Sequence, residues 1–157
     1  FLIQIAAELK KRNVDFKLLL AGTGRLEHKI KKLCKEQKIE DKVIFLGFQK
    51  DIKKFMNNID VFLLPSLWEG FGYVLVEAMF FKCPVIAFNI SSNPEIIENN
   101  KTGFLTEENN LEEMVEKILL LKDNATLRKK IGESAKKRVI DLFSIKKTIL
   151  DVKKLIA

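Results

Sequence analysis

The sequence predicts an α/β fold with a parallel sheet flanked by helices. Short apolar runs alternate with segments whose apolar residues recur at the helical period, as in 16–21 followed by 25–37. This alternation is typical of successive βαβ units. The chain has 157 residues, a length that fits one domain with a sizeable buried core. We therefore expect a single α/β domain over 1–157.

The expected strands are short apolar runs bounded by turn-forming residues. They lie at 16–21, 42–46, 60–64, 84–87 and 102–105. Gly22-Thr23-Gly24 ends the first strand and Gly47 ends the second, because glycine readily adopts the backbone angles of a tight turn.

The expected helices are segments with an apolar stripe at helical spacing or with a start signal. They lie at 1–13, 25–37, 51–57, in the segment that carries Glu77, at 93–98, from 111 onward, and at 125–142. A last helix is capped by Ser144, with Ile145, Ile149, Val152 and Ile156 on its apolar face. The first residues already read as the middle of an amphipathic helix without an initiator Met, so we expect the chain to be a piece of a longer protein.

The composition bounds the function. The formal net charge of +7 comes mainly from scattered lysines, which form either a solvated surface or one that attracts an anionic partner such as a nucleotide phosphate or an anionic lipid. Aromatic residues do not interleave with these lysines, so we expect no nucleic-acid partner. Apolar runs are too short to cross a bilayer. Cys34 and Cys83 have no metal-ligand spacing, as expected of reduced thiols in a cytoplasmic protein.

Two carboxylates flank a glycine-rich turn. Glu69 and Glu77 have the Gly70-Phe71-Gly72 turn between them. The neighbours of Glu77 are almost all apolar, so we expect its side chain to be buried. A buried carboxylate is costly unless it is paired or hydrogen-bonded. The sequence therefore predicts that a ligand or partner binds Glu77.

The turn is expected at the ligand-binding edge of the sheet, beyond the carboxyl ends of the strands. Gly70 and Gly72 allow close approach of the backbone, and their N–H groups at a helix start suit a phosphate. Glu69 and Glu77 suit sugar hydroxyls, because ionised carboxylates accept strong hydrogen bonds. The pattern predicts a site for a nucleoside diphosphate sugar.

The segment 60–79, followed by 83–87 and 94–97, resembles the donor-binding domain of GT-B-fold, retaining glycosyltransferases of family 4. Glu69 and Glu77 match the paired glutamates of that family's E-x7-E motif. The resemblance extends to 21–24, 45–48 and 102–104. It implies a Rossmann-like parallel sheet that forms the C-terminal half of a GT-B fold, followed by a helical tail.

The resemblance implies a role for each matching residue. Glu69, as the catalytic residue, contacts the transferred sugar, and Glu77 accepts hydrogen bonds from the ribose. The backbone of Gly70, Phe71 and Gly72 lies against the sugar and diphosphate. Gly47 and Phe48 border the base. No metal ion or cofactor is implied. The donor is expected to be a UDP-sugar, with a GDP-sugar next.

The resemblance also implies an enzyme that adds a sugar, with retention of configuration, to a glycan or lipid-linked acceptor, as in polysaccharide biosynthesis. The acceptor-binding N-terminal domain, the first strand, and the Arg and Lys that bind the diphosphate would all precede Phe1. We expect this piece to be inactive alone. Cys83 and Ser91-Ser92-Asn93 replace glycines that are common in the family. We expect a cytoplasmic protein. In one interpretation its lysine-rich surface binds the inner face of the membrane peripherally.

Two alternatives remain. One is a GT-B relative that does not transfer sugar, such as a nucleotide-sugar 2-epimerase. The other is a non-catalytic Rossmann-type nucleotide-binding module, against which the incomplete glycine fingerprint at 22–24 argues. The last helix also has two interpretations: its apolar face packs on this domain, or it crosses to an N-terminal domain and is exposed here.

Overall fold

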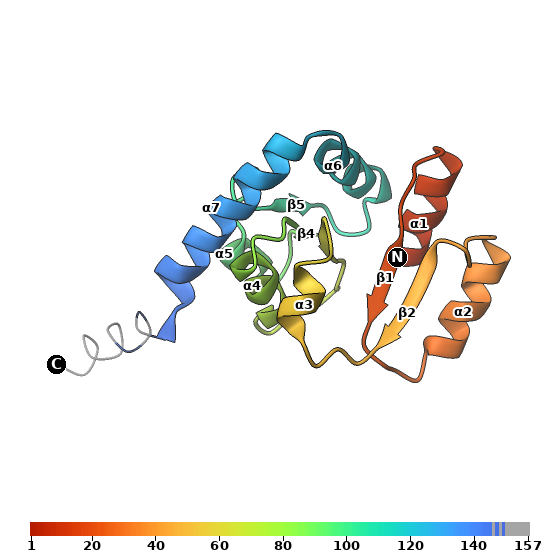
Figure 1. Cartoon of the computed structure of the whole chain (residues 1–157), viewed down its shortest axis with the longest axis horizontal. Helices are drawn as coiled ribbons and strands as arrows, with labels where there is room; N and C mark the ends of the chain where they lie inside the picture. Colours follow the sequence, from red (N-terminus) through yellow and green to blue (C-terminus); the bar gives the residue numbers. More distant parts are fainter. Residues whose placement is uncertain (146, 148, 150–157) are drawn as a thin grey trace. The chain divides into compact units, whose positions relative to one another are not determined.

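The computed structural model describes residues 1–145, 147 and 149. Within it the chain divides into two compact units, Phe1–Phe55 and Met56–Ala157, and each is described by itself (Figure 1). All the strand pairings are parallel. The predicted parallel α/β architecture is confirmed.

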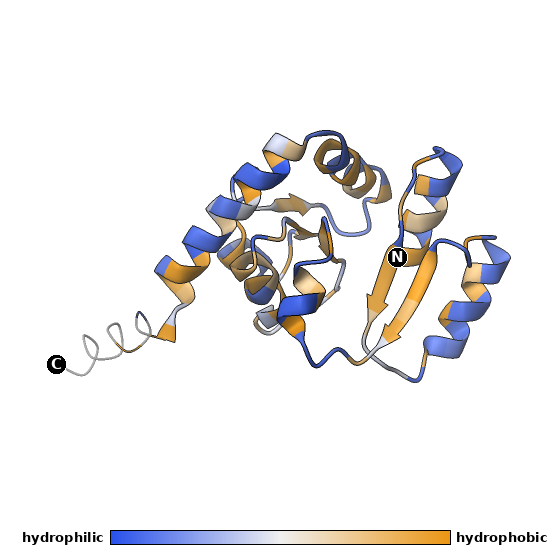
Figure 2. Ribbon diagram, in the orientation of Figure 1, coloured by the Kyte–Doolittle hydropathy of each residue, from blue (hydrophilic) through white to orange (hydrophobic). Residues whose placement is uncertain are grey.

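The first unit is a pair of parallel strands with two helices. It contains α1 (Leu2–Lys11), β1 (Leu18–Ala21), α2 (Glu27–Glu36) and β2 (Val43–Gly47). Strand β1 pairs with β2 from Leu18 opposite Val43 onward. Figure 2 shows apolar residues along both strands and hydrophilic residues over α2. The core brings both helices and both strands together; its buried members are Ile3, Ala6, Cys34, Ile39 and Val43, with Leu18 and Leu20 packed against them.

The second unit is a three-stranded parallel sheet with helices. Helix α3 (Ile52–Met56) spans the boundary between the units, and the other elements are β3 (Phe62–Leu64), α4 (Tyr73–Phe80), β4 (Val85–Phe88), α5 (Asn93–Ile96), β5 (Phe104–Thr106), α6 (Leu111–Asp123) and α7 (Ala125–Phe143). The strand order is β3-β4-β5. All four residues of the central strand β4 are buried, as expected of a parallel strand covered on both faces.

Helices cover this sheet and each other. Helix α4 contacts β3 and β4, α6 contacts β4 and β5, and α7 packs on α4 and α6. Arg138 of α7 donates to the backbone oxygens of Ile96 and Glu95, at 2.7 and 2.8 Å. These bonds attach the second half of α7 to the segment that follows β4.

Helix α7 also approaches the turn after α4 very closely. A Cβ atom on Gly132 would lie 2.2 Å from the carbonyl oxygen of Lys82, so only glycine allows this contact. Beside it, Lys82 Nζ and Glu133 Oε1 are 2.7 Å apart. The approach places the C-terminal end of α7 next to α4.

The element bounds differ from the sequence-based ones by a residue or two, which is the usual uncertainty of helix and strand ends. Ser144 has extended backbone angles, and its Oγ accepts from the backbone N–H of Lys147 at 3.4 Å, as predicted for a cap. Of the apolar face expected after it, Ile145 and Ile149 are exposed. Val152 and Ile156 lie outside the described residues.

Candidate functional site

The predicted glycine-rich turn connects β3 to α4. Gly72 is the N-cap of α4, and no side chain caps this helix end. The N–H groups of Leu75 and Val76 bond to the Gly72 oxygen at 2.9 and 3.3 Å, and Tyr73 N–H bonds to the Phe71 oxygen at 2.7 Å. Because these three N–H groups already have backbone partners, the helix start favours an anion through the positive end of the helix dipole and the backbone of the glycines before it.

Gly72 itself is buried. A Cβ at this position would lie 3.1 Å from Leu75 Cδ1 and 3.5 Å from both Asn93 Oδ1 and Ile96 Cδ1. The side chain of Asn93 is fixed because its Nδ2 donates to the Phe88 oxygen at 3.0 Å. The turn therefore rests directly on residues that follow β4, and the sheet positions it.

Glu69 is half-buried beside this turn, whereas Gly70 is exposed. Glu69 and Gly70 come directly before the start of α4. A carboxylate that is partly shielded and partly accessible can accept hydrogen bonds from hydroxyl groups of a ligand.

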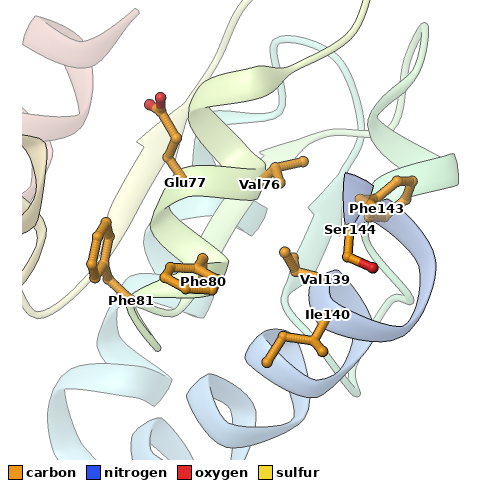
Figure 3. Close-up of a pocket in the computed structure, with 8 residues that line it drawn as sticks. All are labelled: Val76, Glu77, Phe80, Phe81, Val139, Ile140, Phe143 and Ser144. Atoms are coloured by element: carbon orange, nitrogen blue, oxygen red, sulfur yellow. The ribbon is translucent and has the colours of Figure 1, made fainter. Parts of the chain in front are cut away.

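Glu77 is exposed, so the expectation of a buried carboxylate was wrong. The buried residues of α4 are Leu75, Ala78 and Met79, and Glu77 lies on another face of the helix. Figure 3 shows its carboxylate pointing away from the apolar side chains between α4 and α7. The apolar neighbours in the sequence do not surround Glu77 in space, and a ligand can reach it without the cost of a buried charge.

Gly47 and Phe48 belong to the other unit. Gly47 ends β2 with a φ of +63°, a left-handed conformation that favours glycine. The side chain of Phe48 is 72% exposed. The residues predicted to border the base thus belong to the first unit, whereas those predicted to bind the sugar and the diphosphate belong to the unit that begins at Met56. Their joint site stays a prediction.

Sequence reasoning missed an aromatic cluster beside the turn. The ring of Phe71 lies 5.0 Å from that of Tyr73 and 5.6 Å from that of Phe143, both edge-to-face. Phe143 is the last residue of α7, and no pattern in the sequence pairs it with the turn. An apolar groove of about 300 Å³ opens next to it, between α4 and α7 (Figure 3). The groove is lined by Val76, Glu77, Phe80, Phe81, Val139, Ile140, Phe143 and Ser144.

Cys83 stands just before β4 and is 3% exposed. Burial raises the pKa of its thiol to about 12, because removal from water disfavours the thiolate. Its Sγ lies 3.7 Å from the Pro84 oxygen. The thiol is therefore neutral and unreactive near neutral pH.

Metal ligands do not gather in the part of the chain that the structure describes: its His, Cys, Asp and Glu residues form no cluster of three suited to an ion. Within the same residues, none of the helices combines the length and apolarity needed to cross a membrane.

The sequence from residue 1 to residue 138 matches the family described as glycosyl transferases group 1. The chain belongs to this family. The fold agrees with that membership, because the parallel sheet with its flanking helices is the architecture of GT-B glycosyltransferase domains. The predicted family and fold are thus confirmed.

Several known proteins are similar to this chain. The poly(ribitol-phosphate) alpha-N-acetylglucosaminyltransferase of Staphylococcus aureus (strain COL) is 33% identical over 144 residues, which cover 91% of this chain and 29% of the relative. The N-acetyl-alpha-D-glucosaminyl L-malate synthase of Bacillus anthracis is 35% identical over 136 residues, 87% of this chain and 36% of the relative. The chain thus spans well under half the length of these relatives.

Solved structures with over 30% identity share the fold. The crystal structure of TarM matches with a TM-score of 0.91 and 31% identity, over 98% of this chain and 31% of TarM. The C-terminal domain of a group 1 glycosyl transferase from Francisella tularensis matches with a TM-score of 0.79 and 31% identity, over 92% of this chain and 78% of that domain.

Proposed function

We propose that this chain is the donor-binding domain of a retaining glycosyltransferase, which supplies a sugar from a nucleoside diphosphate sugar to a glycan or lipid-linked acceptor. The observation that carries the proposal is the uncapped N-terminus of α4, with Gly70 and Gly72 before it and a carboxylate on either side. Family membership supports the sugar-transfer class, and the residues of this turn support the donor.

The start of α4 is the proposed diphosphate site. The missing side chain of the buried N-cap Gly72 makes room for its packing on Asn93 and Ile96. The exposed Gly70 has no side chain that would stand between its backbone and a ligand. Backbone N–H groups at a helix start stabilise phosphate oxygens, and they also stabilise the negative charge that develops on a leaving diphosphate.

The two carboxylates are the proposed hydroxyl sites. Glu69 binds the transferred sugar from its half-buried position before the turn. Glu77, on the exposed face of α4, accepts from the ribose. Acidic residues suit these roles because a diphosphate would be repelled by them, whereas a diol donates to them.

Relatives support a UDP-sugar as the donor. A crystal structure of S. aureus TarM, 34% identical to this chain, holds UDP and alpha-GlcNAc-glycerol. A Campylobacter jejuni relative, 33% identical, is named for transfer of N-acetylgalactosamine to a diphospho-undecaprenol acceptor. These examples favour UDP over GDP and a polymer or lipid-linked acceptor in polysaccharide assembly.

In the proposed reaction, the bond between the anomeric carbon and the diphosphate oxygen breaks. A new bond forms on the same face between that carbon and the acceptor oxygen, and the proton of the acceptor hydroxyl passes to the departing diphosphate. The chain covers only 29% and 36% of the two relatives described above, so the proposal assigns the cationic residues and the acceptor site to parts of the protein outside this chain. The chain alone is then a binding domain without transfer activity.

Nucleotide binding by this chain tests the proposal. Ligand-detected NMR against UDP, GDP, ADP and NAD should show selective binding of one nucleoside diphosphate, with UDP expected. Glu77→Ala should weaken it by about 10- to 150-fold, since a hydrogen bond to a charged group contributes roughly 1.5–3 kcal/mol.

Glu116→Ala is the matched control, because it removes an exposed glutamate from α6 in the same unit. It should leave the affinity unchanged. Equal affinity in Glu77→Ala and the wild type would disprove the ribose assignment, and binding of NAD in preference to the diphosphates would favour a dinucleotide module instead.

A further inference from the structure

The ring of Phe71 is the side-chain anchor of the glycine-rich turn. It is the one residue of Gly70-Phe71-Gly72 with a side chain, and it is half-buried. Its ring makes edge-to-face contacts with Tyr73 at 5.0 Å and with Phe143 at 5.6 Å. Gly72 is held by its packing on Asn93 and Ile96, whereas the exposed Gly70 restricts the backbone little. The ring of Phe71 is therefore the second point that holds the turn.

The two ring partners of Phe71 differ in how firmly they are themselves held. Tyr73 is 72% exposed, and it belongs to the first turn of the same helix that the glycines precede. Phe143 is half-buried at the end of α7. It therefore comes from a separate element and can hold the turn from outside.

Helix α7 is itself fixed to the second unit at points along its length. Arg138 bonds to the backbone after β4 at 2.7 and 2.8 Å. Gly132 lies against the carbonyl of Lys82 with no room for a Cβ. These contacts set the position of the C-terminal turn of α7, and so of Phe143.

We propose that Phe143 is a positioning residue of the donor site: it holds the ring of Phe71 and so keeps the N–H groups of Gly70 and Gly72 oriented toward the diphosphate. The inference rests on the proposed function of that turn. Phe143 acts through Phe71 and does not touch the donor. Preorganised donors stabilise an anion better than ones that must be ordered on binding.

Phe143→Leu tests the inference, because it keeps an apolar side chain and removes the ring. Aromatic pairs contribute about 0.5–1.5 kcal/mol beyond their burial, which corresponds to a loss of roughly 2- to 12-fold in UDP affinity. In the free protein, the amide NMR signals of Gly70 and Gly72 should shift. Phe143→Tyr keeps the ring and should restore both readouts.

Phe81→Leu is the matched control. Phe81 lines the same groove (Figure 3), is half-buried, and makes its own edge-to-face contact with Phe80 at 5.3 Å. It should lower thermal stability to a similar degree and leave UDP affinity and the two glycine amide signals unchanged.

The outcomes separate the inference from the function on which it rests. Unchanged glycine amide signals in Phe143→Leu overturn the positioning role whether or not nucleotide binds. An equal loss of affinity in Phe81→Leu also overturns it, because the effect would then be general. A third outcome is that the wild type binds no nucleotide while the glycine signals still shift in Phe143→Leu. That result overturns the proposed function and, with it, the role of Phe143 at a donor site. It leaves the contact between Phe143 and the turn intact.

Discussion

Gly132→Ala should destabilise the protein, although the same change usually stabilises a helix. In an ordinary exposed helix, alanine is favoured over glycine by about 0.5–1 kcal/mol. Here the new Cβ would lie 2.2 Å from the Lys82 carbonyl oxygen and 3.0 Å from its carbon. Because both atoms belong to the backbone, no side-chain rotation relieves the clash, and α7 must move away from the turn after α4.

The expected magnitude follows from these opposing terms. Overpacking typically costs about 1–3 kcal/mol, and a clash this short belongs at the upper end. Subtracting the propensity gain of about 1 kcal/mol leaves a loss of about 2 kcal/mol. For a chain of this size the melting temperature should fall by about 4–8 °C.

Thermal unfolding followed by circular dichroism at 222 nm measures this change. Gly24→Ala is the control, since no atom lies within 4 Å of a Cβ at Gly24, and its melting temperature should stay the same or rise slightly. If Gly132→Ala melts at or above the wild-type temperature, α7 does not lie against the Lys82 carbonyl, and the packing on which the position of Phe143 depends is wrong.

Three further predictions concern the donor site and the buried thiol. Under the proposed function, Glu69→Gln in the active glycosyltransferase should reduce kcat by at least about tenfold with little change in nucleotide affinity, because it removes a charge proposed to lie at the transferred sugar. Steady-state kinetics and a UDP titration measure the two quantities, and an equal fall in affinity and kcat would contradict the prediction. Cys83 should resist a thiol reagent at pH 8 until the protein unfolds, since burial raises its pKa to about 12 from 9.0. Between those values the unfolded thiol ionises and the folded one does not, so stability should fall as pH rises from 9 toward 12. Urea titrations across that window should show a shallower decline in Cys83→Ala, and an equal decline would contradict the linkage.

Local sequence patterns predicted the elements well because secondary structure depends mainly on near neighbours. The run 84–87 is apolar throughout, which predicted a strand, and the structure has β4 there, buried at every position. The turn 69–72 was found because its glycines and carboxylate are consecutive. Family membership followed from the same segment and is confirmed.

Burial of single side chains was less predictable. Glu77 has apolar neighbours in the sequence and yet is exposed. In a short helix whose residues are almost all apolar, apolar side chains project from every face. The sequence then does not indicate which face packs on the sheet. In α4 the buried face carries Leu75, Ala78 and Met79. The packing of the helix on β3 and β4 determines that this face is buried and that Glu77 is not.

The sequence alone therefore determined the α/β class, the order of its elements, the glycine-rich turn and the family, since each is written in contiguous residues or in a short repeating period. The tertiary structure decided the exposure of Glu77, the packing of Gly72 against Asn93, and the contact of Phe143 with Phe71. Those features join residues that are distant in the chain. They depend on how closely helices pack against one another and against the sheet, and a local sequence pattern does not predict this.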